Sequence, residues 1–259
     1  GFYTEFSYQI LQAYDFLELY RRYGCTLETG GNDQWGNLVG GMDLIHKVEG
    51  KDVHVMTTPL ITKADGSKFG KSEGGAIWLD PEMLSPYEFY QFWLGAEDAD
   101  VVRFLKVFTF LSRDEIEALA QEVAERPHKR EAQKALAGEV TRLVHGQKAL
   151  EQVIAATEAL WGGGDLQKVD GATLKGATAH LPAATVEIGK TNLVDLLIEA
   201  GFEKGRGAAI RTIKNGGAYL NNQKVTNPDR VIVHEDVLPG SLVLFRKGKR
   251  NLAAAHLHE

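Results

Sequence analysis

Residues 59–80, with the sequence PLITKADGSKFGKSEGGAIWLD, constrain the fold of this chain more than any other segment. Two apolar, strand-like pieces at residues 53–61 and 76–79 bracket a loop that is rich in lysine, serine and glycine. Glycine lets a backbone approach a ligand closely, and closely spaced ammonium groups suit a polyphosphate. The pattern is typical of a phosphate-binding loop between two strands. A solvated lysine-rich turn is the alternative that the spacing leaves open.

The N-terminal segment predicts an amphipathic helix over residues 4–22, because its apolar side chains recur at helical spacing. Along this helix Tyr8, Gln12 and Asp15 stand at positions i, i+4 and i+7 and therefore share one face. They can converge on a small polar ligand, or they can form the edge of a helix that meets water.

Paired glycines follow the next predicted strand, residues 25–29, and lead through Asp33 and Gln34 into a predicted helix at residues 39–48. In an open α/β sheet the ligand binds at the carboxyl ends of the strands, and a strand that ends in glycines and enters a helix fits that place. A turn capped by an aspartate would have the same residues.

Composition is that of an ordinary globular protein, with 44% hydrophobic and 25% charged residues in a chain of 259. The single cysteine, Cys25, excludes an intramolecular disulfide and fits a reducing compartment, and we expect it to be a buried apolar residue. No apolar run approaches the length of a membrane span, and the N-terminus lacks the features of a signal peptide. The expectation is a soluble, cytoplasmic protein without a structural zinc site.

Helical patterns dominate after residue 80 and predict a helical domain at residues 81–161, whose aromatic residues form its core. These patterns begin at Ser85 and Pro86 and continue at residues 98–111, 113–125 and 129–161. The glycine-rich and alanine-rich residues 162–190 predict a linker.

A small α+β domain is predicted at residues 191–259. Two short helices at residues 192–200 and 204–215 precede a hairpin that turns at Asn221 and Asn222, and residues 238–252 are β-like. Residues 190–250 contain 11 Lys and Arg against 6 Asp and Glu, in a chain whose net charge is −6. This local excess of positive charge favours contact with a polyanion.

The lysine loop is where the chain first resembles a known family. Lys68-Phe69-Gly70-Lys71-Ser72 resembles the lysine loop of class I aminoacyl-tRNA synthetases, and residues 59–80 resemble the form found in bacterial tyrosyl-tRNA synthetases. The resemblance implies that Lys68 and Lys71, beside Ser72, are the catalytic residues. They would hold the ATP triphosphate and stabilise the pyrophosphate leaving group by placed positive charge.

The N-terminal helix also resembles the tyrosine-binding helix of this family. The resemblance implies that Tyr8 and Gln12 contact the amino group of tyrosine, that Asp15 accepts a hydrogen bond from the phenol, and that Gln34 faces the carboxylate or the adenylate. A carboxylate placed for a hydroxyl is left unpaired when phenylalanine enters, which gives specificity.

The ATP and adenylate site is implied in the same way. Asp33 would hold the ribose, Gly31 would let the ribose lie against the backbone, and Leu60 and Ile61 would pack the adenine ring, with Lys71 on the phosphates. The family most often has serine where this chain has Asn32.

The C-terminal pattern resembles the RNA-binding fold of the ribosomal S-four protein type, with which bacterial tyrosyl-tRNA synthetases end. The resemblance implies salt-sensitive binding of RNA phosphates through five basic residues. These are Lys204, Arg206, Arg211, Lys214 and Lys224. The helical domain would carry anticodon recognition.

The fold class expected from the whole resemblance is a multidomain α/β protein. It would have the second half of a Rossmann-type catalytic domain at residues 1–80, a helical anticodon-binding domain, and the S-four-type domain. The eight histidines contain no His-x-Gly-His element, which this family needs at the start of its nucleotide fold. We therefore expect this chain to be a C-terminal portion of the enzyme that is inactive alone.

The implied activity is that of a tyrosine–tRNA ligase in protein biosynthesis. Its substrates would be L-tyrosine, ATP accompanied by Mg²⁺, and tRNA(Tyr), in a cytoplasmic homodimer with no metal site made by the protein. A non-catalytic RNA-binding module is the alternative, and a tryptophanyl-tRNA synthetase is a more distant one, because Tyr8, Gln12 and Asp15 together match the tyrosine pattern.

Overall fold

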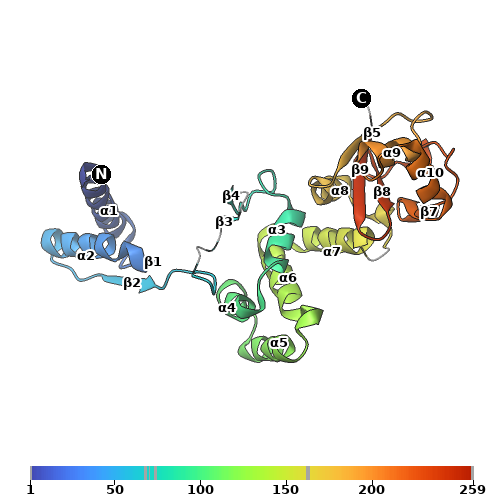
Figure 1. The fold of residues 1–259 in the computed structure, drawn as a ribbon. Coiled ribbons are helices and arrows are strands. Elements are labelled where there is room, and N and C mark those ends of the chain that lie inside the picture. The colour runs from blue at the N-terminus through green and yellow to red at the C-terminus, as the bar shows by residue number, and fades with distance from the viewer. Residues whose placement is uncertain (1, 67–68, 70, 73–74, 162–163, 258–259) are drawn as a thin grey trace. The chain divides into compact units, whose positions relative to one another are not determined.

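The computed structural model describes residues 2–66, 69, 71–72, 75–161 and 164–257. The chain divides into two compact units, Gly1–Gly70 and Lys71–Glu259, which are described separately (Figure 1). No helix among the described residues combines the length and the apolar character that crossing a membrane requires.

The first unit packs two helices with a pair of parallel strands. The two strands are in register from Leu27 opposite His54 to Gly31 opposite Thr58. The elements in chain order are α1 (Phe2–Tyr23), β1 (Leu27–Gly31), the 3-10 helix η1 (Asn32–Gln34), α2 (Trp35–Glu49) and β2 (His54–Thr58). Both predicted helices and both predicted strands are therefore present, and β2 is shorter than the predicted segment 53–61.

The core of the first unit lies between α1 and α2. Phe16 and Leu17 of α1 are buried with Ile45 of α2 and with Val53. Gly41 permits the close approach of the two helices, because a Cβ at that position would lie 2.9 Å from Cδ1 of Phe16. A larger residue at position 41 would push the helices apart.

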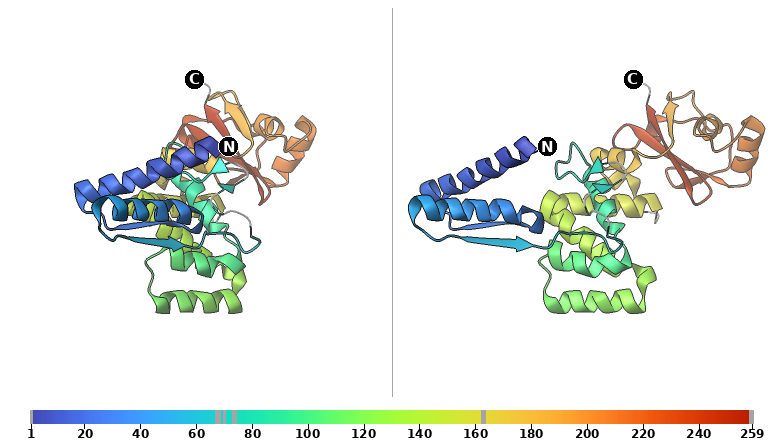
Figure 2. Two further views of the ribbon diagram at one scale, coloured as in Figure 1. Left: turned by 90° about the vertical axis from the view of Figure 1, so that its left-hand side faces the viewer. Right: turned by 60° about the vertical axis from the view of Figure 1, so that its left-hand side comes forward.

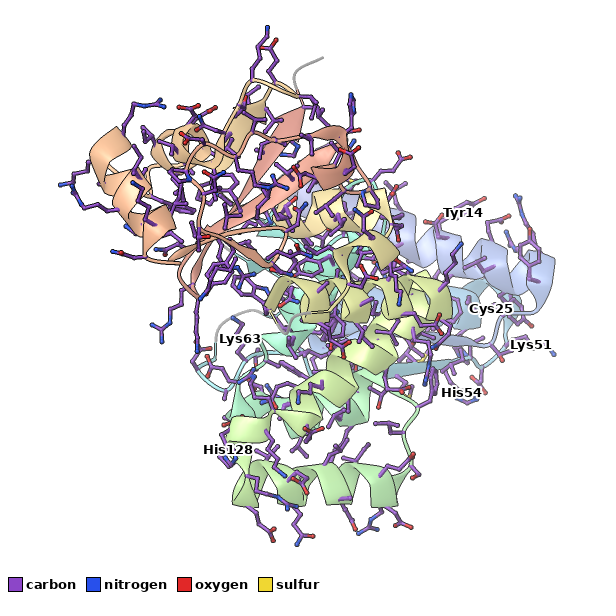
Figure 3. The ribbon with its side chains drawn as sticks, turned by 90° about the vertical axis from the view of Figure 1, so that its right-hand side faces the viewer. Tyr14, Cys25, Lys51, His54, Lys63 and His128 are labelled. Atoms are coloured by element: carbon purple, nitrogen blue, oxygen red, sulfur yellow. The ribbon has the colours of Figure 1, made fainter. Side chains whose placement is uncertain are left out.

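The first half of α1 keeps its apolar side chains at the surface. Phe6, Ile10 and Leu11 are 64%, 53% and 64% exposed, whereas Ala13 is the first described residue of the helix that is buried. The amphipathic prediction is therefore confirmed for the second half of the helix alone. Cys25, in the turn between α1 and β1 (Figure 3), is half-buried at the edge of the core rather than fully buried as expected.

The second unit begins with a short antiparallel strand pair and continues with helices. These elements are β3 (Lys71–Ser72), β4 (Gly75–Ala76), α3 (Pro86–Leu94), α4 (Asp98–Phe108), α5 (Arg113–Glu125), the 3-10 helix η2 (Pro127–Lys129), α6 (Glu131–His145) and α7 (Gln147–Trp161). Capping boxes fix two of the helix starts, Ser85 with Glu88 for α3 and Ser112 with Glu115 for α5.

The predicted helical segment 129–161 is divided into two helices, so its prediction as one pattern is wrong. Gly146 separates α6 from α7 with a φ of 86°, a backbone conformation that a helix cannot contain. The aromatic residues of α3 form core, as predicted. Phe89 and Trp93 are buried, and Trp93 meets Phe108 of α4 edge to face with ring centroids 4.9 Å apart.

A five-stranded sheet organises the C-terminal part of the second unit. Its strand order is β5-β9-β8-β6-β7, with β5 parallel to β9 and the other pairs antiparallel. The elements are η3 (Leu166–Lys168), α8 (Gly171–Thr178), β5 (Ala183–Val186), α9 (Leu193–Glu199), α10 (Arg206–Lys214), β6 (Ala218–Leu220), β7 (Gln223–Val225), η4 (His234–Asp236), β8 (Leu242–Lys247) and β9 (Asn251–Leu257). The predicted hairpin turns at Asn221 and Asn222, which have φ of 46° and 66°.

Helices cover both faces of this sheet (Figures 1 and 2). Side chains alternate along β8, so that Val243 and Phe245 are buried against α9 and α10, whereas Leu242 and Leu244 are buried against α7 and α8. One sheet therefore shares a core with the last helix of the predicted helical domain.

The prediction of a linker at residues 162–190 is wrong for the residues that the structure describes there. They form η3, α8 and β5, and Leu166, Val169 and Leu174 are buried in the core on the α7 side of the sheet. The polar and alanine-rich composition hid these apolar residues, which are spaced too widely to show a periodic pattern. Two hydrogen bonds also join the C-terminal sheet to the end of α7. Asn222 and Arg246 donate them, each at 2.6 Å, to the carbonyls of Ala159 and Leu160.

Candidate functional site

Gln12 and Asp15 of α1 lie at strand β1, whereas Tyr8 stands one turn earlier on the same helix. Nε2 of Gln12 donates a hydrogen bond to Oε1 of Glu28 at 3.4 Å. Asp15 is exposed but close enough for its charge to act on Glu28. Tyr8 is 55% exposed. The structure therefore brings two of the three predicted residues to one carboxylate on the neighbouring strand.

Glu28 is the residue of this region that sequence reasoning missed. Burial raises the pKa of the Glu28 carboxyl and the negative charge of Asp15 raises it further, while the hydrogen bond from Gln12 lowers it. The available signal was a glutamate inside a short strand of a parallel pair, because such strands are usually apolar.

Two acceptor atoms in this group have no hydrogen-bond partner within the described chain. Oε1 of Gln12 and Oε2 of Glu28 are both buried and unsatisfied. Because a buried polar atom without a partner is costly, these two oxygens are suited to a donor from a ligand. With the carboxylate of Asp15 they make a locally negative, acceptor-rich site.

A second group of predicted residues meets at the carboxyl end of β1. A Cβ at Gly31 would lie 2.7 Å from Oδ1 of Asp33 and 2.9 Å from Cδ2 of Leu60. These three residues are therefore in contact range, and the bare backbone of Gly31 faces the space between the two side chains. Leu60 and Ile61 are 58% and 37% exposed, so their apolar surfaces are available.

Gln34 is held from two sides. Its Nε2 donates to Oδ2 of Asp33 at 3.4 Å, and its Oε1 accepts from Nδ2 of Asn37 at 3.0 Å. A Cβ at Gly30 would lie 3.3 Å from Cβ of Gln34, which places the side chain directly against β1. The parallel strand pair thus presents Gly31, Asp33 and Gln34 at its carboxyl end, where open α/β sheets bind ligands.

The predicted catalytic residues fall largely outside the described residues. Lys68 is not described, and for Lys71 and Ser72 the structure describes the backbone, in β3, but not the side chains. Their roles stay predictions. Among the described residues, no group of three or more His, Cys, Asp or Glu side chains is arranged to hold a metal ion.

The five predicted RNA-binding residues are exposed on the C-terminal part of the second unit. Arg206 begins α10 and pairs with Asp195 at 2.7 Å. Lys224 of β7 lies close to the end of α10, because its Nζ would be 3.4 Å from a Cβ at Gly216. Lys204, Arg211 and Lys214 are exposed in and just before the same helix. The structure therefore gathers these cations around α10 and the adjoining hairpin.

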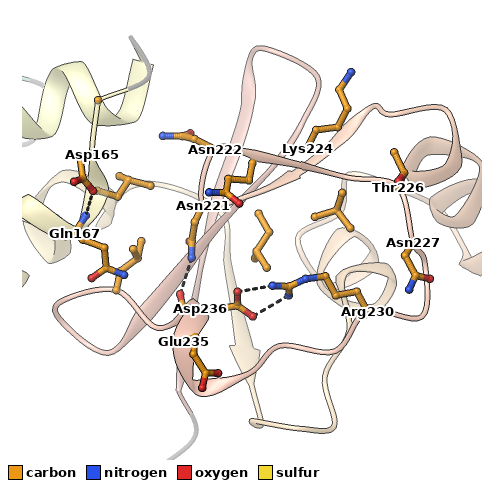
Figure 4. A pocket seen from close by; sticks show the side chains of 16 residues that line it. Asp165, Gln167, Asn221, Asn222, Lys224, Thr226, Asn227, Arg230, Glu235 and Asp236 are labelled. Atoms are coloured by element: carbon orange, nitrogen blue, oxygen red, sulfur yellow. Dashed lines mark hydrogen bonds and ion pairs between the residues drawn. The ribbon is translucent and has the colours of Figure 1, made fainter.

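A cavity of about 620 Å³ lies near this hairpin and is lined by the segments around η3, β7 and η4 (Figure 4). Its arginine, Arg230, is already engaged by Asp236 through contacts of 2.8 and 2.6 Å. Burial would raise the pKa of Asp236, but the hydrogen bonds from Arg230 and from the Val233 N–H outweigh it and lower the pKa. Asn221 donates to the carbonyl of Asp236 at 2.6 Å, so these polar groups stabilise the domain.

Two family descriptions match the chain. The family described as tRNA synthetases class I (W and Y) matches residues 2–162, and the one described as Tyrosine--tRNA ligase SYY-like C-terminal domain matches residues 173–254.

Curated relatives and solved structures agree with this match. The chain is 57% identical over 256 residues to a protein of Streptomyces avermitilis named Tyrosine--tRNA ligase, covering 98% of this chain and 60% of that protein. A protein of the same name from Kineococcus radiotolerans is 50% identical over 252 residues. A C-terminally truncated mitochondrial tyrosyl-tRNA synthetase of Aspergillus nidulans matches 61% of this chain and 45% of its own, with 34% identity and a TM-score of 0.52. The chain spans about 60% of the length of the curated relatives that it matches.

Proposed function

The chain belongs to the class I tRNA synthetases (W and Y), and we propose that the full-length protein is a tyrosine–tRNA ligase. The observation that carries this proposal is the placement of two groups of residues at one strand. The Gln12, Asp15 and Glu28 group lies beside β1, and the Gly31, Asp33 and Leu60 group lies at its carboxyl end. Glu28 and Gly31 are three residues apart, or about 10 Å along the strand. An aminoacyl-adenylate, which joins an amino acid to a ribose through one phosphate, matches this arrangement.

The amino-acid end of the ligand would lie at α1. Tyr8 and Gln12 would contact the ammonium group, and the carboxylate of Asp15 would accept a hydrogen bond from the tyrosine phenol. Its exposed carboxylate in the described chain is compatible with a ligand hydroxyl. Phenylalanine would leave this carboxylate desolvated without a donor, which disfavours its binding.

The nucleotide end would lie at the carboxyl end of β1. Asp33 would bind the ribose against the backbone of Gly31, Leu60 and Ile61 would pack the adenine, and Gln34 would face the carboxylate or the adenylate. Lys68, Lys71 and Ser72 would act on the triphosphate while the tyrosine carboxylate attacks the α-phosphate in line and pyrophosphate leaves. Mg²⁺ would accompany ATP on its phosphates.

The C-terminal part of the second unit would bind tRNA(Tyr). We assign it to the S-four type of RNA-binding fold, with Lys204, Arg206, Arg211, Lys214 and Lys224 facing phosphates. The gathering of these cations at α10 and the β6–β7 hairpin supports this assignment. The tRNA would span a homodimer in the cytoplasm, as the family resemblance implies.

Pyrophosphate exchange into ATP tests the proposal. The full-length protein should exchange labelled pyrophosphate in the presence of L-tyrosine and not of L-phenylalanine or L-tryptophan. Exchange driven by tryptophan instead would assign the protein to the other specificity of its family. Transfer of labelled tyrosine to tRNA(Tyr) then tests the second step.

A non-catalytic RNA-binding role is the second candidate, and one observation favours it for the polypeptide of 259 residues. The second unit contains two extensive cores, one on each face of the C-terminal sheet, and so holds the basic α10 surface without help from the first unit. Salt-sensitive tRNA binding by this polypeptide, with no tyrosine-dependent exchange by the full-length protein, would support this role over the ligase.

A further inference from the structure

We propose that Glu28 is a positioning residue which orients Gln12 for the ammonium group of the amino-acid substrate; this inference rests on the proposed function. The amide of Gln12 has one donor end and one acceptor end, and a rotation of its last torsion exchanges them. Only the acceptor end can bind an ammonium group. Something in the protein must therefore select between the two orientations.

Glu28 makes that selection. Its Oε1 accepts the Nε2–H of Gln12 at 3.4 Å, and a carboxylate cannot donate to the opposite orientation. With the donor end so engaged, Oε1 of Gln12 points away from Glu28, where it is buried and has no partner in the described chain. A ligand ammonium would supply the missing donor.

The charge around Glu28 favours the same ligand. Oε2 of Glu28 is also buried without a partner, and the charged neighbour that acts on Glu28 is another carboxylate, Asp15. A desolvated carboxylate is stabilised by a nearby cation, and the described residues provide none in an ion pair with Glu28. A metal ion is a poorer fit than an ammonium, because no third carboxylate, histidine or cysteine joins the group within the described residues.

The side of β1 that carries Glu28 also carries Gly30. Gly30, on the same side of β1 two residues on, packs against Gln34 and Leu38, whereas Glu28 uses this side of the strand for a polar contact with α1. At a part-buried strand position without a ligand site, an apolar residue would be more stable than a carboxylate with an unpartnered oxygen. Ligand orientation explains the glutamate.

The test compares two ligands in variants of the full-length protein. The ligands are L-tyrosine and 3-(4-hydroxyphenyl)propionate, which lacks the ammonium group and keeps the phenol and the carboxylate. Glu28→Leu removes the acceptor, so we expect the Kd of tyrosine to rise about tenfold while the Kd of the deaminated ligand is unchanged. Glu28→Gln keeps an acceptor for Gln12 but also offers a donor that the opposite orientation of Gln12 can use, so we expect its Kd for tyrosine to rise by less than that of Glu28→Leu.

The deaminated ligand also reports on folding, because a misfolded variant would lose both ligands. Glu49→Gln, which alters a carboxylate paired with Arg21, is the matched control and should change neither Kd. An unchanged ratio of the two Kd values in Glu28→Leu, an equal loss of both ligands, or a loss in Glu28→Gln as large as in Glu28→Leu would overturn the inference. Absence of tyrosine binding to the wild-type protein would instead overturn the proposed function, and the inference with it.

Discussion

Substitution of Gly31 by alanine should weaken ATP use while leaving tyrosine binding unchanged. Gly31 has φ of −73° and ψ of 160°, which alanine adopts without strain. The effect of the new methyl group is therefore purely steric. It would lie 2.7 Å from Oδ1 of Asp33 and 2.9 Å from Cδ2 of Leu60, the residues assigned to the ribose and the adenine.

The size of the effect follows from these distances. Ordinary van der Waals contact begins near 3.4 Å, so the Asp33 carboxylate must move by about 0.7 Å and the Leu60 methyl by about 0.5 Å. Both side chains can move, so folding should be preserved. A displacement approaching 1 Å of a substrate-positioning group can reduce a rate by up to about 100-fold. We expect kcat/KM for ATP to fall between about 10-fold and 100-fold.

Steady-state pyrophosphate exchange at varied ATP and varied tyrosine measures this effect. Gly40→Ala in α2 is the matched control, because nothing lies within 4 Å of a Cβ at that position. It should leave the exchange kinetics unchanged and raise stability by about 1 kcal/mol, the helix propensity difference. Wild-type kcat/KM for ATP in Gly31→Ala would refute the placement of the nucleotide against Gly31.

Three further predictions concern the second unit. Asp236→Asn should lower the free energy of unfolding by about 1–3 kcal/mol at neutral pH, less than a fully buried pair because Arg230 is 37% exposed. The pKa of Asp236 is lowered in the folded state, so the stabilisation by its carboxylate is present above its unfolded pKa and is lost as the pH falls through the folded pKa. Denaturation curves of the wild type and Asp236→Asn should therefore differ at pH 7 and converge in acid. Asn222→Ala should destabilise more than Asn222→Gly by about 1 kcal/mol in thermal melts, because the φ of 66° suits glycine, and equal melts would contradict this. Lys214→Ala combined with Lys224→Ala should reduce the salt slope of tRNA binding by about 2, and an unchanged slope would remove both lysines from the interface.

The sequence predicted best the elements whose ends are set by neighbouring residues. The start of α5 follows from Ser112 and Glu115, which form a capping box, and its predicted bounds of 113–125 are those observed. The hairpin at Asn221 and Asn222 was predictable because asparagine tolerates the left-handed conformation that the turn requires. The resemblance to tyrosyl-tRNA synthetases is confirmed by the family match and by the curated relatives.

Features that depend on distant contacts were not predictable in this way. Leu166, Val169 and Leu174 are buried because the sheet and α7 pack around them. The local sequence pattern does not indicate their burial. The break at Gly146 was missed because a lone glycine in a helical pattern is often tolerated, and only the positive φ shows that the helix ends there.

The candidate site likewise contains residues whose association is predictable from the sequence and residues whose contact depends on the fold. Gly31, Asp33 and Gln34 adjoin in sequence, so their association could be expected before the structure was known. The contact between Gln12 and Glu28 joins a helix to a strand 16 residues away and required the fold. Resemblance to a family indicated Gln12 as a ligand contact but did not indicate what holds its amide in one orientation.

The direction of β1 links the two halves of the site and explains the position of Gln34. Glu28 precedes Gly31 along the strand, so a ligand with its ammonium near Glu28 has its ribose about 10 Å further on. Gly30 lies between these ends. Gln34 packs on Gly30, since a Cβ at position 30 would lie 3.3 Å from Cβ of Gln34. In the proposed reaction a bond forms between the tyrosine carboxylate and the α-phosphate. This bond would lie in the middle of such a ligand, between its ammonium and its ribose. Because Asn37 and Asp33 hold the Gln34 amide from either side, we expect that side chain to face the reacting groups of the proposed reaction from a fixed position.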